Sequence, residues 1–86
     1  MSQSTPKTLV YSDPHCPVCK TVTKTLRPAV KAGKVTIVKD GSKKAKQILE
    51  QVKIRYVPEC VTEVEPGKFV RCDIAKLVRQ AEKGEL

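Results

Sequence analysis

The sequence of 86 residues contains no tryptophan, and its only aromatic residues are Tyr11, Tyr56 and Phe69. Proteins that bind single-stranded nucleic acid stack the bases on aromatic side chains, so this scarcity argues against such a surface. No apolar run approaches the roughly 20 residues that span a bilayer, and we therefore expect no contact with a membrane. The N-terminus also lacks the apolar segment of a secretory signal, which predicts a cytoplasmic protein.

Positive charge, in contrast, is abundant. The chain has 17 Lys and Arg residues against nine Asp and Glu, which gives a formal net charge of +8. Such a charge attracts nucleic acid, an acidic protein or an acidic substrate, but it also simply keeps a protein soluble. Because net charge bears on association and not on fold, we interpret it as a solvated lysine-rich surface. We expect a monomer that does not bind nucleic acid.

A chain of this length is expected to form a single domain, residues 1–86, with residues 1–6 as a polar N-terminal tail. The apolar pattern predicts four strands, over residues 8–12, 34–40, 57–64 and 68–72. Apolar residues at helical spacing predict three helices, which begin near Pro17, after Ser42 and after Asp73.

The predicted elements follow one another in the order β-α-β-α-β-β-α. A β-α-β unit requires two parallel strands joined by a right-handed crossover. The last two strands flank Pro66-Gly67, which suits a type II turn, so they form an antiparallel hairpin. The sequence therefore predicts an α/β fold with a four-stranded mixed sheet flanked by helices. Pro28 is expected to kink the first helix or to mark its last turn.

The stretch YSDPHCPVCK contains a C-x-x-C pair, Cys16 and Cys19, at the junction of a strand and a helix. Cys16 falls close to the helix N-cap, where unpaired N–H groups and the helix dipole stabilise a thiolate. Cys19 lies over the same turn, within reach for an intramolecular disulfide. With Pro17 at the first helical position, this arrangement favours a redox dithiol. The flanking His15 and Lys20 are candidates for tuning the pKa of the thiols.

Four cations share one face of the same helix: Lys20, Lys24, Arg27 and Lys31. Their positive field favours a thiolate at the start of the helix. Like charges at this spacing repel each other, so the row of cations is a poor structural device. An ordinary solvated helix face is the alternative interpretation for any one of the four.

Two further cysteines, Cys60 and Cys72, lie on the predicted hairpin. With a two-residue turn Cys60 lies opposite Asp73 and the two cysteines point to opposite faces, whereas a one-residue bulge would bring them into register. Because the cytosol keeps thiols reduced, we expect free thiols that pack as small hydrophobic side chains. The alternatives are a mutual disulfide, acting as a second redox pair, and a metal site.

The segment VYSDPHCPVCK after a strand, together with IRYVPECV ahead of a hairpin, resembles the thioredoxin and glutaredoxin superfamily over nearly the whole chain after residue 6. The resemblance implies a thioredoxin-like fold with a cis peptide bond between Val57 and Pro58, facing the dithiol. It implies an enzyme, a thiol–disulfide oxidoreductase, in which Cys16 attacks a protein disulfide and Cys19 resolves the mixed disulfide. The residues expected to contact the substrate are Pro17, Val18, Tyr56, Val57 and Pro58. For Tyr56, a packing role in a half-buried position is the alternative.

The sequence departs from glutaredoxins where they bind glutathione. Asp13 stands near the place of their usual basic residue, Val18 replaces their aromatic residue after Cys-Pro, and RCD replaces their Gly-Gly step. Asp73, within RCD, is explained by its role as a helix N-cap. We therefore expect no bound cofactor, and we favour a dithiol reductase independent of glutathione over the alternative of one that uses it. The implied partners are disulfide-containing proteins and a thioredoxin-reductase-like enzyme that recharges the dithiol.

The competing interpretation is a zinc-binding module with nucleic-acid affinity from its basic surface. Its ligands would be Cys16, Cys19, Cys60 and Cys72. Structural zinc sites usually bring two close cysteine pairs, whereas eleven residues separate the second pair here. A third alternative is an iron–sulfur-bridged dimer like those of glutaredoxins, which would need a glutathione site. We expect no metal ligands in this chain.

Overall fold

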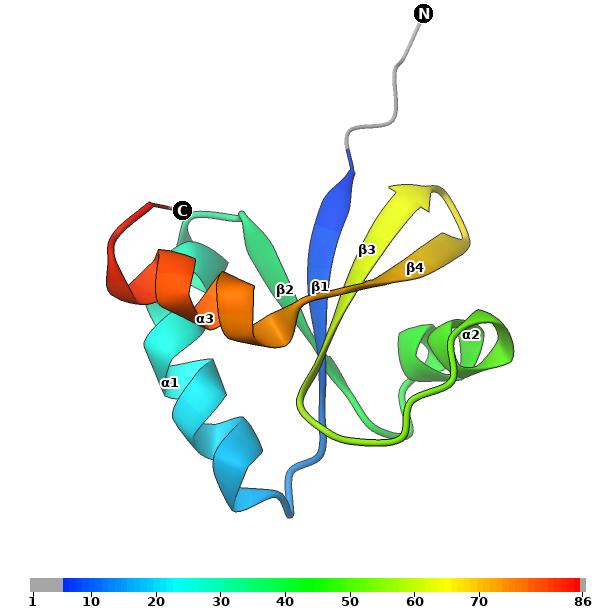
Figure 1. Ribbon diagram of the computed structural model, residues 1–86. Coiled ribbons are helices and arrows are strands. Elements are labelled where there is room, and N and C mark those ends of the chain that lie inside the picture. The colour runs from blue at the N-terminus through cyan, green and yellow to red at the C-terminus, as the bar shows by residue number, and fades with distance from the viewer. Residues whose placement is uncertain (1–5, 86) are drawn as a thin grey trace, which may run out of the picture.

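A computed structural model of the protein describes residues 6–85 and contains one four-stranded sheet with helices on both faces (Figure 1). The strands are β1 (Lys7–Ser12), β2 (Val35–Lys39), β3 (Glu59–Glu65) and β4 (Lys68–Cys72). Their spatial order is β2-β1-β3-β4. β1 pairs parallel with β2 and antiparallel with β3, and β3 pairs antiparallel with β4. The sheet is mixed, as the sequence predicts.

Three helices complete the predicted order of elements: α1 (Pro17–Lys31), α2 (Lys43–Gln51) and α3 (Ile74–Glu82). α1 and α3 pack against each other on one face of the sheet, and α2 covers the other face (Figure 1). The predicted fold class is therefore confirmed. No helix in residues 6–85 is both long and apolar enough to cross a membrane. The predicted polar tail lies outside the described residues except for Pro6, which is exposed.

Local capping explains where the helices begin. The Ser42 hydroxyl accepts the backbone N–H of Ala45 at 3.2 Å, and the Asp73 carboxylate accepts the N–H groups of Ala75 and Lys76. Both caps satisfy donors that have no partner inside the helix. Pro28 lies within the last turn of α1, one of the two positions that the sequence predicts for it.

The central strand β1 is buried on both faces. Leu9 and Tyr11 pack against the α2 side, whereas Val10, between them, packs against α1 and α3. This alternation follows from the period of two residues in a strand. The core on the α1 side also contains Leu26 and Cys60, so the cysteine of β3 is part of the structure that supports α1.

The hairpin contains a bulge that changes the pairing of its cysteines. Glu65 pairs with Lys68 across the turn, but the register shifts between Glu63 and Glu65. The Glu63 carboxylate accepts the Gly67 N–H at 3.0 Å and lies 3.4 Å from the Lys44 ammonium. These contacts, the Gly67 hydrogen bond first, lower the pKa of Glu63 despite its burial. The bulge is thus stabilised by its own side chain and by α2.

As a result of the bulge, Cys60 lies opposite Cys72. A disulfide joins the two residues, whose Cα atoms are 4.9 Å apart. The expectation of two free thiols is therefore wrong, and the alternative of a mutual disulfide is what the structure contains. The physical reason is the register, because one extra residue on β3 turns both side chains to the same face of the sheet.

Removal of this disulfide is expected to lower the free energy of unfolding. Closing a loop of this size restricts the unfolded chain by about 2 to 3 kcal/mol, so Cys60→Ala/Cys72→Ala should lose about that much in denaturant unfolding. Thiol counting on the unfolded protein, after mild reduction of the accessible dithiol, should find two thiols. A count of four would show that Cys60 and Cys72 are not bonded.

A matched pair of leucine substitutions tests the core. Leu26 is fully buried in α1, whereas Leu49 in α2 is 48% exposed. Leu26→Ala should destabilise the protein by about 3 kcal/mol, because a cavity remains in the core, and Leu49→Ala by well under about 1 kcal/mol. Thermal and urea unfolding of both variants measure the difference. Similar losses would mean that the α1 core is not packed as described.

Candidate active site

The two cysteines of the C-x-x-C pair share the first turn of α1. Cys16 is the N-cap, with extended backbone angles of φ −96° and ψ 116°, and its sulfur accepts the Cys19 N–H at 3.2 Å. Its own N–H donates to the carbonyl of Asp13 at 3.0 Å, which closes the turn before the helix. Pro17 occupies the first helical position without losing a hydrogen bond, because that N–H would be unpaired in any case.

The two thiols lie in different environments. The pKa of Cys16 is lowered, chiefly by a hydrogen bond from the Cys19 thiol and by the Cys19 and Val18 N–H groups, against partial burial and the Asp13 charge. The pKa of Cys19 is raised to about 11, chiefly because its side chain is buried, with 2% of the residue exposed. The Cys16 sulfur and the Asp13 carboxylate contribute to that rise. Cys16 is therefore the more exposed thiol and the one that ionises more readily, whereas Cys19 is buried and holds its proton more tightly.

The loop before β3 completes the site. The sulfur of Cys16 lies 3.8 Å from the carbonyl oxygen of Val57, a residue 41 positions away in sequence. The peptide bond between Val57 and Pro58 is cis, as the resemblance to the superfamily implies. Tyr56 is 77% exposed, so the packing role considered for it is wrong. Its contact with a substrate stays a prediction.

The other residues predicted for the site lie around Cys16. Pro17 and Val18 are exposed, and Val18 has 59% of its surface accessible. His15 is exposed, and its backbone N–H donates to the Asp13 carboxylate at 2.9 Å. The charged neighbour that shifts the pKa of both thiols is Asp13. The tuning roles of His15 and Lys20 stay predictions.

An apolar groove lies beside the dithiol, and sequence reasoning missed one of its walls. The groove is lined by residues of α1, of the cis peptide bond and of α3: Val18, Val22, Pro58, Ile74, Val78 and Arg79. The spacing of Ile74 and Val78 predicts a buried helix face, but both side chains are only half-buried. No signal in the sequence distinguishes these half-buried positions from the buried Leu77.

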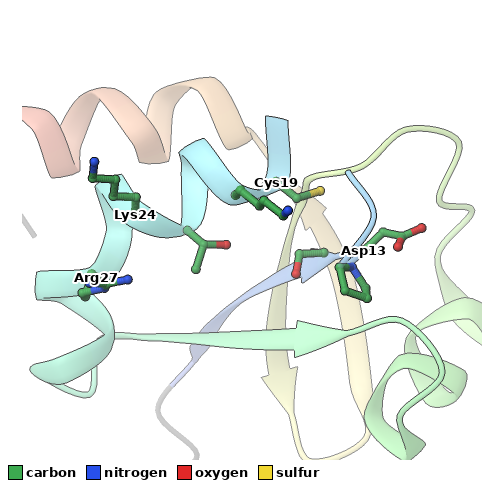
Figure 2. A pocket seen from close by; sticks show the side chains of 8 residues that line it. Asp13, Cys19, Lys24 and Arg27 are labelled. Atoms are coloured by element: carbon green, nitrogen blue, oxygen red, sulfur yellow. The ribbon is translucent and has the colours of Figure 1, made fainter. Parts of the chain in front are cut away.

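A second pocket is lined by residues of α1, including Cys19, and by residues at the end of β1 (Figure 2). Its lining includes Asp13, Cys19, Lys20, Lys24 and Arg27. Figure 2 shows the two labelled cations, Lys24 and Arg27, on α1, and Asp13 beyond Cys19 at the end of β1. The pocket is therefore polar and mainly cationic, in contrast to the apolar groove.

The zinc alternative is wrong, because two of the four cysteines that it requires are not free to bind a metal. Cys60 and Cys72 are bonded to each other, so they offer no thiolates to a metal. Between residues 6 and 85, no group of three or more His, Cys, Asp or Glu side chains is placed to hold a metal ion.

Comparison with known proteins bears on the fold. No protein-family model matches the sequence, and no curated protein matches it. Among solved structures, the chain is similar to the J-Trx1 fragment of ERdj5, with a TM-score of 0.60 and 15% sequence identity. The chain has a thioredoxin-like fold. The match covers 92% of this chain and 42% of the ERdj5 fragment, so this chain spans less than half of the length of that fragment.

The ionisation of the two thiols can be tested by alkylation. Iodoacetamide reacts with thiolates, so its rate at Cys16 should rise with pH up to the lowered pKa and then level off. Cys19, with a pKa of about 11, is about 100-fold less ionised at neutral pH than an ordinary thiol, and it should remain unmodified.

The control is Cys19→Ala, which removes the hydrogen bond that most lowers the Cys16 pKa. The midpoint of the alkylation profile should then move to higher pH. An unchanged midpoint, or equal alkylation of both cysteines in the unmutated protein, would contradict the assigned environments. Mass spectrometry of the modified peptides identifies which sulfur has reacted.

Proposed function

We propose that the protein is a thiol–disulfide oxidoreductase that reduces protein disulfides through Cys16 and Cys19. The observation that carries this proposal is the contrast between an N-cap thiol with a lowered pKa and a buried thiol with a raised one. The Cys16 sulfur also accepts the N–H of Cys19 at 3.2 Å, so the two residues are held in one turn. The thioredoxin-like fold supports the same chemistry.

In the first step, the Cys16 thiolate attacks one sulfur of the substrate disulfide. A bond forms between Cys16 and that sulfur, the substrate disulfide breaks, and the departing thiolate takes a proton from water. In the second step, Cys19 loses its proton and attacks the Cys16 sulfur. The Cys16–Cys19 disulfide forms and the second substrate thiol leaves, so the substrate is reduced by two electrons and the dithiol is oxidised.

The structure gives a reason for the order of the two steps. Ionised Cys16 is one cause of the raised pKa of Cys19, so Cys19 stays protonated while Cys16 is a free thiolate. Once Cys16 is bonded to the substrate, its negative charge is gone and this cause disappears. The pKa of Cys19 then falls, and the resolving thiolate becomes available when it is needed.

The surfaces around Cys16 suit an extended protein chain as substrate. Val57 offers its backbone carbonyl beside the sulfur, and Tyr56, the residue before it, is exposed. The apolar groove of α1 and α3 can take a side chain next to the substrate cysteine, since its walls are almost entirely hydrocarbon. Pro17 and Val18 complete this proposed contact surface.

We further propose that a thioredoxin-reductase-like enzyme returns the dithiol to its reduced form in the cytoplasm. Asp13 stands near the place where glutaredoxins carry a basic residue, so no glutathione or other cofactor is assigned. The disulfide of Cys60 and Cys72 is not required for the two steps above. Its use as a second redox pair therefore remains outside this mechanism.

Serine substitutions of the two cysteines test the mechanism. Cys16→Ser should reduce the rate of insulin reduction by dithiothreitol to that of the uncatalysed reaction, because the nucleophile is lost. Cys19→Ser should accumulate a covalent complex with the substrate, visible on a non-reducing gel, because the mixed disulfide is not resolved. Cys60→Ala/Cys72→Ala is the control and should keep reductase activity. Full turnover by folded Cys16→Ser would overturn the proposed function.

A further inference from the structure

The outer face of α1 concentrates positive charge. Lys20, Lys24, Arg27 and Lys31 are all exposed, and the 15 residues of this helix include no acidic residue. Half of the formal net charge of +8 therefore lies on one helix. We call these four residues the cationic face of α1. The other two helices are different, because each mixes its cations with a glutamate.

Within residues 6–85, the cationic face has no ion-pair partner. The ion pairs found between residues 6 and 85 join Lys44 to Glu63 and Arg71 to Glu59, and neither involves α1. Three pairs of like charges, at 20 and 24, at 24 and 27 and at 27 and 31, have the spacing at which helical side chains meet and repel. A helix face that only had to be solvated would be more stable with charges of both signs. The purely positive composition of this face therefore favours a role in binding an anionic partner.

The cationic face begins next to the dithiol. Lys20 directly follows Cys19, and Lys20, Lys24 and Arg27 line the pocket that reaches this buried thiol (Figure 2). At 1.5 Å per residue, the face extends about 16 Å along α1, and its neighbouring charges lie about 6 Å apart along the axis. This spacing is shorter than the Debye length of about 8 Å at physiological salt, so the four charges act together on an approaching partner.

We propose that the cationic face of α1 docks an acidic surface of the protein whose disulfide exchanges with Cys16. The inference rests on the proposed function, since the face ends at a thiol pair and a partner bound there is placed for exchange. Nucleic acid would satisfy the charge but carries no disulfide for Cys16 to attack. Val18 and Val22 of the apolar groove lie on the opposite side of α1, so a single partner can contact both surfaces around the dithiol.

The test uses two synthetic peptides, each with one intramolecular disulfide. They are identical except that four glutamates follow the second cysteine in one peptide and four glutamines in the other. The measured quantity is the second-order rate at which each peptide oxidises the reduced protein. Electrostatic steering should make the acidic peptide at least about tenfold faster at low salt, and the ratio should approach one at about 1 M salt.

Two charge-reversal variants locate the effect. Arg27→Glu/Lys31→Glu changes residues about 12 and 18 Å along the helix from Cys19, so the dithiol itself is left in place. Lys43→Glu/Lys46→Glu makes the same change in net charge on exposed residues of α2, which covers the other face of the sheet. The ratio of the two peptide rates should fall to about one in the α1 variant and stay near its original value in the α2 variant. Taking the ratio removes any change in the ionisation of Cys16, because both peptides react with the same thiolate.

The outcomes separate the docking surface from the proposed function. Exchange with the neutral peptide reports the function alone, and its absence would overturn both that function and the docking proposal that rests on it. Equal rates for the two peptides, or an equal loss of preference in both variants, would overturn the docking proposal and leave the function standing. A short DNA duplex that binds more tightly than the acidic peptide, and loses affinity in the α1 variant alone, would identify a nucleic-acid surface and also overturn it.

Discussion

The rest of the site depends on how α1 begins. Cys16 occupies the N-cap, and its sulfur accepts the N–H of Cys19 in place of the oxygen that usually caps a helix. A sulfur accepts a hydrogen bond from an unpaired backbone N–H more strongly when it is a thiolate than when it is a thiol. The same hydrogen bond therefore caps the helix and lowers the pKa of Cys16. Pro17 at the first helical position adds no unsatisfied donor to this turn, because proline has no backbone N–H.

The contrast between the two thiols follows from the same turn. Three residues after the N-cap, the helix has rotated far enough to bury Cys19 beneath its first turn, while Cys16 stays at the surface. Burial penalises the thiolate of Cys19, and the charge of Cys16 adds to that penalty. One helix therefore carries one cysteine whose pKa is lowered and one whose pKa is raised.

The buried face, the first turn and the outer face of α1 have different roles. Its buried face, which includes Leu26, holds the helix to the sheet and to α3, and its first turn carries the dithiol. Its outer face carries cations that no ion pair within residues 6–85 neutralises. The disulfide joins Cys60, in the core on the α1 side of the sheet, to the partly buried Cys72, so it stabilises the sheet against which α1 packs and is separate from the C-x-x-C pair.

The sequence by itself determined the order of elements, the mixed sheet, and the position of Cys16 at a helix start, because spacing, caps and turn residues act between near neighbours. The tertiary structure decided which distant groups meet. A bulge of one residue, supported by contacts of Glu63 with the turn and with α2, brought Cys60 to Cys72 and excluded the free thiols expected from composition. The packing of α3 decided the apolar groove. The position of Val57 beside the Cys16 sulfur is implied by the resemblance to the superfamily and not by any local pattern. Register and burial are set by contacts across many residues of chain, and a local pattern contains no information on a shift of a single residue.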